Sequence, residues 1–224
     1  MLIDHWPLLG LRLDTPRLRL RLPGPEELAE LADLAAAGLH DPELMPFSVP
    51  WSDLPPAERA RSVVQHHWRR LGNWTPDNWQ LNLTVFEDGR AVGRQSLWAR
   101  DFRSLREVAT ASWVGRAHQG RGIGTEMRAA VLTLAFDGLG AGDAVSGAFQ
   151  DNPASHRVST KLGYVADGVE RQLVRGRPAV MRRVRLTADR WRTVEHHRAT
   201  LTGLAPCLPL FGLPAPQRTE PPAG

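Results

Sequence analysis

Three glycines in five residues, Gly120, Gly122 and Gly124, separate two segments of different periodicity. Residues 108–114 have the β-branched and aromatic content of a strand, and residues 125–139 place apolar side chains along one helical face. Glycines at the start of a helix let backbone N–H groups converge on an anion, which the helix dipole also favours. The sequence therefore predicts a strand, a turn that can hold a pyrophosphate, and a helix.

The spacing of these glycines excludes two common nucleotide-binding motifs. A Rossmann G-x-G-x-x-G would need a further glycine at Thr125 or Met127. A P-loop would need a lysine directly after the glycines, and Lys161 is the one lysine of the chain. A glycine-rich connection that binds no ligand remains the alternative to a pyrophosphate cradle.

The other segments predict a mixed sheet. Period-two patterns and turn signals place strands at residues 9–22 (interrupted at Thr15-Pro16), 79–86, 91–99, 108–114, 145–149, 164–174 and 179–186. Helical spacing places helices at residues 26–39, 56–71 and 125–139, and a fourth opens at Asn152-Pro153 and ends before Gly163. Strands first, then strand–helix alternation, then a hairpin, predict an α+β fold with helices packed on a mixed sheet.

Length and composition predict one domain in residues 1–203 and a proline-rich tail in residues 204–224. Within the tail, Leu208, Leu210 and Phe211 could dock on the body. The chain has no long uncharged apolar run and no basic-then-apolar start. We therefore expect a cytoplasmic protein without a membrane segment.

Charge and cysteine usage limit the partners. The 28 basic residues include only one lysine and the formal net charge is +4, so the pI of about 10.4 comes from scattered arginines rather than a phosphate-binding stripe. We expect no nucleic-acid partner, and salt-dependent DNA binding would reveal that rival function.

Cys207 is the only cysteine, which excludes disulfides and thiolate-rich metal sites. The pairs His66-His67 and His196-His197 are adjacent in sequence and point about 100° apart on a helix, so we expect no metal.

Two sequence blocks carry a family resemblance. The first is Gln119-Gly120-Arg121-Gly122-Ile123-Gly124, and the second comprises Asn152-Pro153-Ala154-Ser155, Val158 and Lys161-Leu162-Gly163-Tyr164. They resemble the pyrophosphate loop, Gln/Arg-x-x-Gly-x-Gly/Ala, and the second conserved block of the GNAT superfamily of acyl-CoA-dependent N-acyltransferases. The resemblance extends over residues 11–191. It implies the GNAT fold, with a mixed, mostly antiparallel central sheet and helices on both faces, and an acyltransferase that uses acyl-CoA as co-substrate.

Further segments narrow the resemblance. Thr15-Pro16-Arg17-Leu18-Arg19-Leu20-Arg21 and Gly124-Thr125-Glu126 look like the RimJ/RimL branch, which acylates protein N-termini and small amines. His5-Trp6-Pro7-Leu8, residues 40–51 and Pro209-Leu210-Phe211-Gly212 look like an actinobacterial subgroup described as succinyl-CoA transferases. The resemblance thus implies transfer of a succinyl or acetyl group, with succinyl favoured, to an amine acceptor that the sequence does not identify.

The resemblance also implies a set of CoA-binding residues. Backbone groups on the strand predicted at residues 108–114 would pair with the pantetheine arm and polarise the thioester carbonyl. The glycine loop would hold the pyrophosphate. These residues are Ser112, Trp113, Val114, Gln119, Gly120, Arg121, Gly122, Ile123, Gly124, Thr125, Asn152 and Ser155. Spacing alone makes Asn152, which precedes Pro153, a helix N-cap, and the resemblance makes it a CoA contact.

Acyl transfer needs a neutral amine, a stabilised oxyanion and a protonated leaving thiolate. Ser159 stands where many GNAT enzymes have the tyrosine that protonates the thiolate, and a bound water is the alternative donor. Asp101 and Glu107 flank the turn before residue 108 and are candidate bases. A solvated turn charge is the other explanation for each carboxylate.

Met45, Phe47 and Trp51 are candidates for the wall of the acceptor pocket, although core packing explains them equally well. If the donor is succinyl-CoA, its free carboxylate needs a cation, and we expect an arginine or histidine near residues 45–51 to bind it. The rival from another class is a non-catalytic acyl-CoA-binding or regulatory protein, which Ser159 in place of tyrosine permits. A homodimer is compatible with the sequence.

Overall fold

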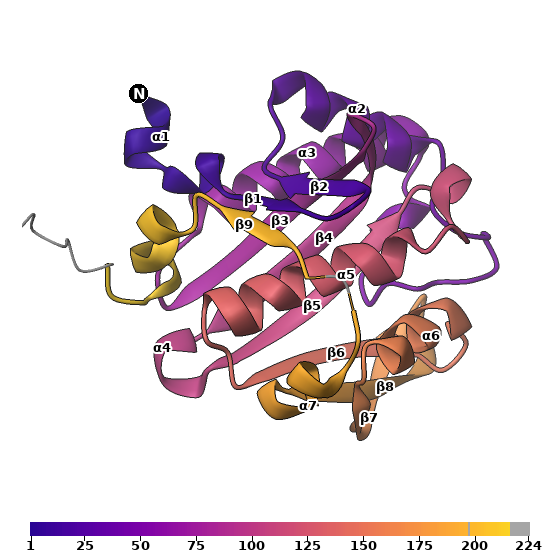
Figure 1. Cartoon of the computed structure of the whole chain (residues 1–224). Helices are drawn as coiled ribbons and strands as arrows, with labels where there is room; N and C mark the ends of the chain where they lie inside the picture. The colour runs from indigo at the N-terminus through magenta and orange to yellow at the C-terminus, as the bar shows by residue number, and fades with distance from the viewer. Residues whose placement is uncertain (197, 216–224) are drawn as a thin grey trace, which may run out of the picture.

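The computed structural model describes residues 1–196 and 198–215, which form one mixed sheet with helices on both faces (Figure 1). The strands are β1 (Arg12–Asp14), β2 (Leu18–Arg21), β3 (Asn78–Glu87), β4 (Arg90–Arg100), β5 (Glu107–Val114), β6 (Asp143–Phe149), β7 (Val165–Val174), β8 (Arg177–Thr187) and β9 (Thr200–Thr202). The α-helices are α1 (Leu2–His5), α2 (Pro25–Ala36), α3 (Pro56–Gly72), α4 (Phe102–Leu105), α5 (Ile123–Thr133), α6 (Pro153–Lys161) and α7 (Ala188–Thr193). Shorter turns are η1 (Pro7–Gly10), η2 (Trp51–Asp53), η3 (Arg116–His118), the π-helical η4 (Leu134–Gly138) and η5 (Ala205–Phe211).

The strand order within the described residues is β7-β8-β6-β5-β4-β3-β2-β1-β9, and β5 with β6 is the parallel pair. These two strands pair over three positions only, from Glu107 with Asp143 to Ala109 with Val145. Beyond Ala109 and Val145, β5 and β6 are no longer paired. The sheet therefore splits open along the second half of β5.

The two faces of the sheet carry different layers. Helix α5 crosses one face and contributes to the main core, and every residue from Met127 to Thr133 is buried. Helices α2 and α3 cover the opposite face, where Leu31 and Val63 pack against Phe86 and Trp113 of the sheet. The predicted arrangement with helices on both faces is confirmed.

The predicted strands and helices are found in the structure with local differences, and the short elements α1, α4, α7 and β9 were not predicted. The extended segment at 9–22 is a hairpin, because the backbone turns at residues 15–17 between β1 and β2. The helix predicted from residue 125 begins at Ile123, since Gly122 adopts the left-handed conformation and ends the preceding turn. The same helix widens into the π-helical turn η4 before residue 139.

Part of the predicted proline-rich tail is built into the core. The side chains of Cys207 and Phe211 in η5 are fully buried, and the Phe211 ring centroid lies 4.9 Å from that of Trp79. The Trp74 indole N–H donates to the Leu210 carbonyl at 2.7 Å. Burial raises the pKa of the Cys207 thiol to about 11, so this cysteine is a poor nucleophile. Residues 216–224 of the tail, like His197, lie outside the described residues.

No helix within residues 1–196 or 198–215 combines the length and apolar character needed to cross a bilayer.

Truncating the docked segment tests its part in the core. We expect Phe211→Ala to lower the free energy of unfolding by about 3–5 kcal/mol, because the ring fills a closed aromatic cluster. Urea denaturation measures this loss. Val169→Ala, at a side chain that is 67% exposed on β7, is the control and should change stability little. Equal effects of the two substitutions would contradict the assignment.

The histidines of α3 predict a pH dependence of stability. Burial, followed by the positive charge of Arg94, lowers the pKa of His66 and of His67 to about 4. The unfolded chain titrates near pH 6.5 and takes up protons first as the pH falls. We therefore expect the free energy of unfolding to be highest above pH 6.5 and to fall between pH 6.5 and 4.

Urea midpoints measured at pH 7.5 and pH 5 check this expectation. The His66→Asn/His67→Asn double variant should lose less stability than the wild-type chain over the same interval. A double variant with an unchanged loss would place the pH dependence elsewhere.

Candidate functional site

The glycine loop lies at the mouth of the split between β5 and β6. Gly120 and Gly122 have φ of +77° and +84°, which side-chain-bearing residues rarely adopt. The backbone N–H groups of Gly122, Ile123 and Gly124 donate to no acceptor in the described part of the chain. Three unpaired donors at the positive end of α5 form a cradle for an anion.

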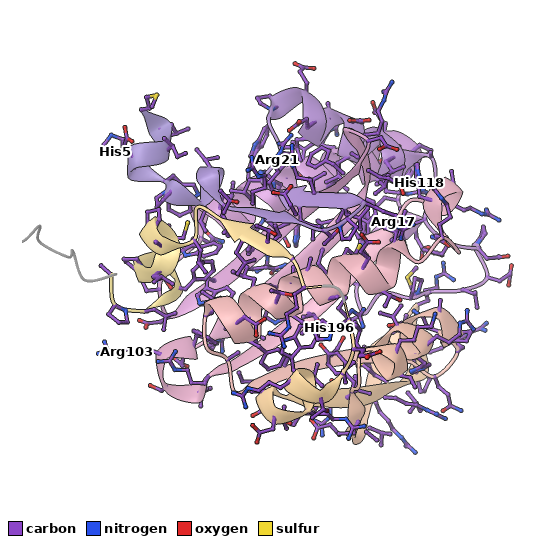
Figure 2. All side chains as sticks on the ribbon, viewed as in Figure 1. His5, Arg17, Arg21, Arg103, His118 and His196 are labelled. Carbon is purple, nitrogen blue, oxygen red and sulfur yellow. The ribbon has the colours of Figure 1, made fainter. Side chains whose placement is uncertain are left out.

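The turn between β1 and β2 fixes this cradle. The Thr15 hydroxyl donates to Glu126 Oε1 at 2.7 Å, and Arg17 Nη2 lies 2.6 Å from Glu126 Oε2. Arg17, whose side chain is labelled in Figure 2, also donates to the Arg121 carbonyl at 3.2 Å. Burial raises the pKa of Glu126, but the hydrogen bonds from Thr15 and Arg17 outweigh it and hold the pKa below its usual value. The carboxylate is thus a structural anchor for the first turn of α5.

Two predicted cradle residues direct their side chains to the protein. Gln119 Nε2 donates to the carbonyls of Leu39 and Val114 at 2.7 and 2.8 Å, and so joins the loop after α2 to the end of β5. Arg121 Nη2 lies 2.9 Å from Glu87 Oε2. The side chains of these two residues therefore fix the loop to its neighbours and are not free to bind a ligand.

Helix α6 starts as its sequence predicts. Asn152 Oδ1 accepts a hydrogen bond from the backbone N–H of Ser155 at 3.1 Å, so the N-cap interpretation of Asn152 is confirmed. A Cβ on Gly124 would lie 3.6 Å from Val158, an ordinary contact. Helix α6 therefore packs against the first turn of α5 and borders the cradle.

A buried arginine spans the split. Arg128 on α5 donates to the Ser159 hydroxyl at 3.1 Å and to the Ser112 hydroxyl at 3.4 Å. It makes no ion pair with a carboxylate among the described residues, and burial lowers its pKa. Burial also raises the pKa of the neighbouring Tyr164 phenol. The predicted residues Ser112 and Ser159 are thus brought together by a guanidinium.

Asp101 is not brought to this site. It lies beyond the end of β4 with φ of +52° and caps the start of α4. Gln95 is the register partner of Ser112, and six residues of β4, roughly 20 Å, separate Gln95 from Asp101. The structure therefore corrects the assignment of Asp101 as a base that faces the cleft. Glu107 is likewise engaged, because it accepts from Arg185 at 2.6 Å.

On the α2/α3 side of the split, part of β5 and β6 is left uncovered, and we call this uncovered strip the groove. Ala111 of β5 and Gly147 of β6 are exposed although both strands lie inside the sheet. Side chains of central strands are exposed only where no layer covers them. Trp113, the residue two positions along from Ala111, is buried on the same face, with its ring centroid 6.2 Å from that of Trp51.

The three predicted substrate residues line one loop beside the groove. Phe47 and Trp51 have ring centroids 5.1 Å apart, and Met45 packs with Phe149 of β6 and Val174 of β7. The loop from residue 40 to residue 54 thus bridges the ends of β5, β6 and the β7–β8 hairpin.

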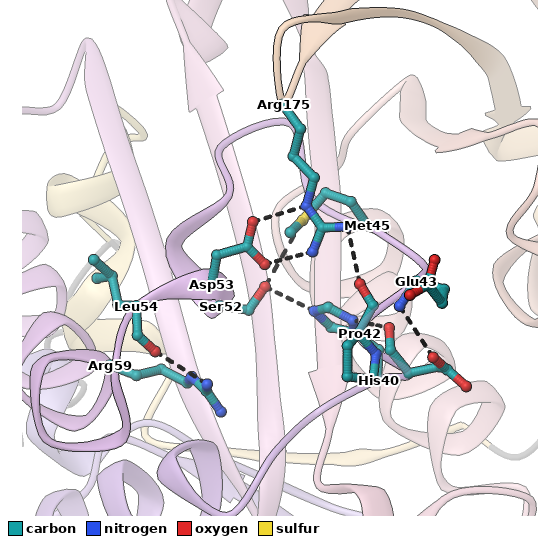
Figure 3. A network of polar contacts seen from close by, with 10 residues as sticks. His40, Pro42, Glu43, Met45, Ser52, Asp53, Leu54, Arg59 and Arg175 are labelled. Atoms are coloured by element: carbon teal, nitrogen blue, oxygen red, sulfur yellow. Dashed lines mark hydrogen bonds and ion pairs between the residues drawn. The ribbon is translucent and has the colours of Figure 1, made fainter.

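An ion pair locks this loop to the hairpin (Figure 3). Arg175 at the hairpin tip binds both carboxylate oxygens of Asp53, at 2.5 and 2.8 Å, and donates to the Pro42 carbonyl at 2.9 Å. The hydrogen bonds from Arg175 hold the pKa of Asp53 below its usual value. Within the loop, His40 Nε2 lies 2.7 Å from the buried Ser52 hydroxyl.

A shallow depression of about 280 Å³ lies beside the β1–β2 turn rather than in the split. Its arginines Arg17, Arg19 and Arg21 pair with Glu126, Asp14 and Glu27. These carboxylates neutralise the depression, so it offers an anion less than the cradle does. The described residues contain no cluster of three potential metal-binding side chains.

Two residues of the site, Arg94 and Arg128, were not among the sequence predictions. Each is the single charged residue in an otherwise uncharged run, at 91–99 and at 127–136. A lone charge inside an apolar strand or helix is buried together with its neighbours, and it then needs a partner. That signal was present in the sequence.

Comparison with known proteins agrees with this geometry. RimJ from Mycobacterium smegmatis, solved in complex with CoA-disulfide, superposes with a TM-score of 0.65 at 19% identity and covers 82% of this chain and 90% of its own. RimL, a ribosomal L7/L12 alpha-N-protein acetyltransferase in complex with coenzyme A, gives 0.62 at 16% identity, with 77% and 95% covered. A chimera of spermidine N-acetyltransferase SpeG from Vibrio cholerae and hSSAT gives 0.61 at 15% identity, with 79% and 99% covered.

These similarities show the fold. The acetyltransferase (GNAT) domain family matches residues 17–165, which include the cradle, the split and α6. The match to this family covers most of the chain, and the matched residues form the split sheet and its anion cradle. The chain therefore belongs to the GNAT acetyltransferases.

Proposed function

We propose that this acyltransferase moves a succinyl or acetyl group, with succinyl favoured, from CoA directly to an amine, without a covalent enzyme intermediate. The observation that carries the proposal is the row of three unpaired N–H groups from Gly122 to Gly124 at the mouth of the β5/β6 split. A pyrophosphate bound there directs the pantetheine arm along the free edge of β5. The lone, buried Cys207 fits a cytoplasmic location.

The chemistry at the split follows from its side chains. The amine nitrogen forms a bond to the thioester carbon, the C–S bond breaks, and the nitrogen loses a proton while the leaving sulfur gains one. Arg128 donates to Ser159, so the hydroxyl hydrogen of Ser159 stays available to the leaving thiolate. The cation beside this hydroxyl also favours negative charge on the sulfur. This arrangement gives Ser159 the role that a tyrosine has in many related enzymes.

The acceptor enters from the groove side. The aromatic rings of Phe47 and Trp51 and the exposed backbone at Ala111 and Gly147 leave room for an amine beside β5. RimL and SpeG, which share the fold, are named for a protein N-terminus and for spermidine. The acceptor of this chain is an amine of either class.

Blocking the cradle tests the CoA site. We expect Gly122→Val to weaken binding of acetyl-CoA and succinyl-CoA about tenfold or more, because a side chain is strained at this positive φ and would distort the row of N–H donors. Isothermal titration calorimetry measures the dissociation constants. The control is Gly140→Val, which also has a positive φ, +69°, but lies beyond the opposite end of α5. Equal losses in both variants would contradict the cradle.

Removing the buried cation tests the leaving-group step. We expect Arg128→Met and Ser159→Ala each to lower kcat about a hundredfold while the Kd for CoA stays close to wild type. The double variant should be no slower than the worse single variant, because the two residues act as a unit. Steady-state kinetics measure these effects. The control is Arg103→Met, at an exposed arginine on α4, which would reveal a nonspecific effect of charge loss. An unchanged kcat in Arg128→Met would leave that residue a structural role only.

A further inference from the structure

Arg94 on β4 is a second guanidinium without a counter-charge, and the residue is partly buried. Its Nε atom is buried and has no hydrogen-bond partner, and the residue forms no ion pair with the described part of the chain. Its guanidinium carbon lies 5.7 Å from the ring centroid of Trp113. An unpaired buried charge is costly, and a native protein keeps one where a ligand neutralises it.

The surroundings of Arg94 are polar and unsatisfied. On the same face of the sheet, the Thr84 hydroxyl, the Asn82 Nδ2 and the Trp113 indole N–H are buried without partners. The His66 Nε2 on α3 is buried in the same condition. Folded proteins leave few such atoms, so this group of five, which we call the Arg94 cluster, indicates a place where a polar ligand binds.

The charges around the Arg94 cluster are positive or neutral. Arg69, Arg70 and Arg94 are the cations. Burial, followed by the positive charge of Arg70, lowers the pKa of Arg94 to about 10. His66 and His67 are neutral at pH 7 because of their low pKa values. No carboxylate of the described chain is hydrogen-bonded or ion-paired to this group, so the missing partner is an anion.

The strand register places the Arg94 cluster beside the groove. Arg94 pairs in register with Trp113, which lies between Ser112 and Val114 on the strand that faces CoA. Ser96 pairs with the exposed Ala111, one strand repeat of about 7 Å from Arg94. An extended group that reacts at β5 can therefore reach Arg94 along the face of β4.

The basic side chains that hold the loop of residues 40–54 already have partners. Arg175 is held by Asp53 and the Pro42 carbonyl, and His40 by Ser52 and the Asp41 carbonyl. The carboxylate partner that we expected from this loop is thus not free there. Arg94, in contrast, lies beside the groove and has no carboxylate partner in the described part of the chain.

We propose that Arg94 binds a carboxylate that one of the two substrates brings into the groove. The inference rests on the proposed acyltransferase function and adds that the site selects a substrate with a free carboxylate. The carboxylate has two sources, the far end of a dicarboxylic acyl group on CoA or the α-carboxylate of an amino-acid acceptor. A planar guanidinium binds either one through two parallel hydrogen bonds.

The first arm of the test compares succinyl-CoA with butyryl-CoA, a neutral thioester of similar length, by calorimetry. A donor carboxylate predicts that wild type prefers succinyl-CoA about tenfold or more, and that Arg94→Met removes this preference. Arg94→Lys keeps the charge but cannot form two parallel hydrogen bonds, so it should keep part of the preference for succinyl-CoA. Arg100→Met, at the exposed end of the same strand, is the matched control and should keep all of it.

The second arm measures turnover of acetyl-CoA with free α-amino acids and with their carboxamides. An acceptor carboxylate predicts a preference for the acids in kcat/KM that Arg94→Met abolishes, with no preference in the first arm. Either pattern supports the proposal and identifies the source. If Arg94→Met changes neither ratio by more than about twofold, the proposal is overturned while the acyltransferase function stands. If wild type binds no acyl-CoA, the proposed function fails, and the role of Arg94 fails with it.

Discussion

The divergence of β5 from β6 is the constraint on which the site depends. After three paired positions the two parallel strands part, and the hydrogen-bonding edge of β5 loses its neighbour. An unpaired edge inside a sheet is unfavourable unless another chain or a ligand satisfies it. The cradle from Gly122 to Gly124, at the end of this edge, has unpaired donors of its own. One extended ligand with phosphates at one end and amide groups along its length satisfies both features.

Two cations flank β5 on opposite faces. Arg128 contacts Ser112 from the α5 side, and Arg94 lies opposite Trp113 on the α3 side. Acyl transfer moves negative charge from the carbonyl oxygen to the sulfur, so a low-dielectric site with fixed positive charges favours that movement. The same charges lower the stability of the free protein, because Arg128 is buried and Arg94 partly buried, and neither has a carboxylate partner among the described residues. The site is thus built at the expense of local stability.

The sequence predicted the parts of the site that depend on local patterns. Glycine spacing identified the cradle, and Asn152 before Pro153 identified the start of α6. Side-chain partners depend on long-range packing, which local patterns do not encode. Gln119 therefore proved to bind two backbone carbonyls, and Asp101 proved to lie at the wrong end of β5. The docking of η5 was equally hidden, since proline-rich composition suggested a tail and only the Trp74–Trp79 surface explains why Phe211 is buried.

The stability missing from the site is supplied at the opposite end of the sheet. Trp79 of β3 lies in register with Ala99, close to the end of β4 that is remote from the cradle, and its ring contacts Phe102 and Phe211. Aromatic rings bury large apolar areas and add edge-to-face attraction, so this cluster is a strong local core. Because η5 completes it, residues near the carboxyl end of the chain stabilise the strands that carry Arg94 and Ser112. A closed aromatic core stabilises one end of β5. The chain can therefore tolerate an open, charged split at the other end of this strand.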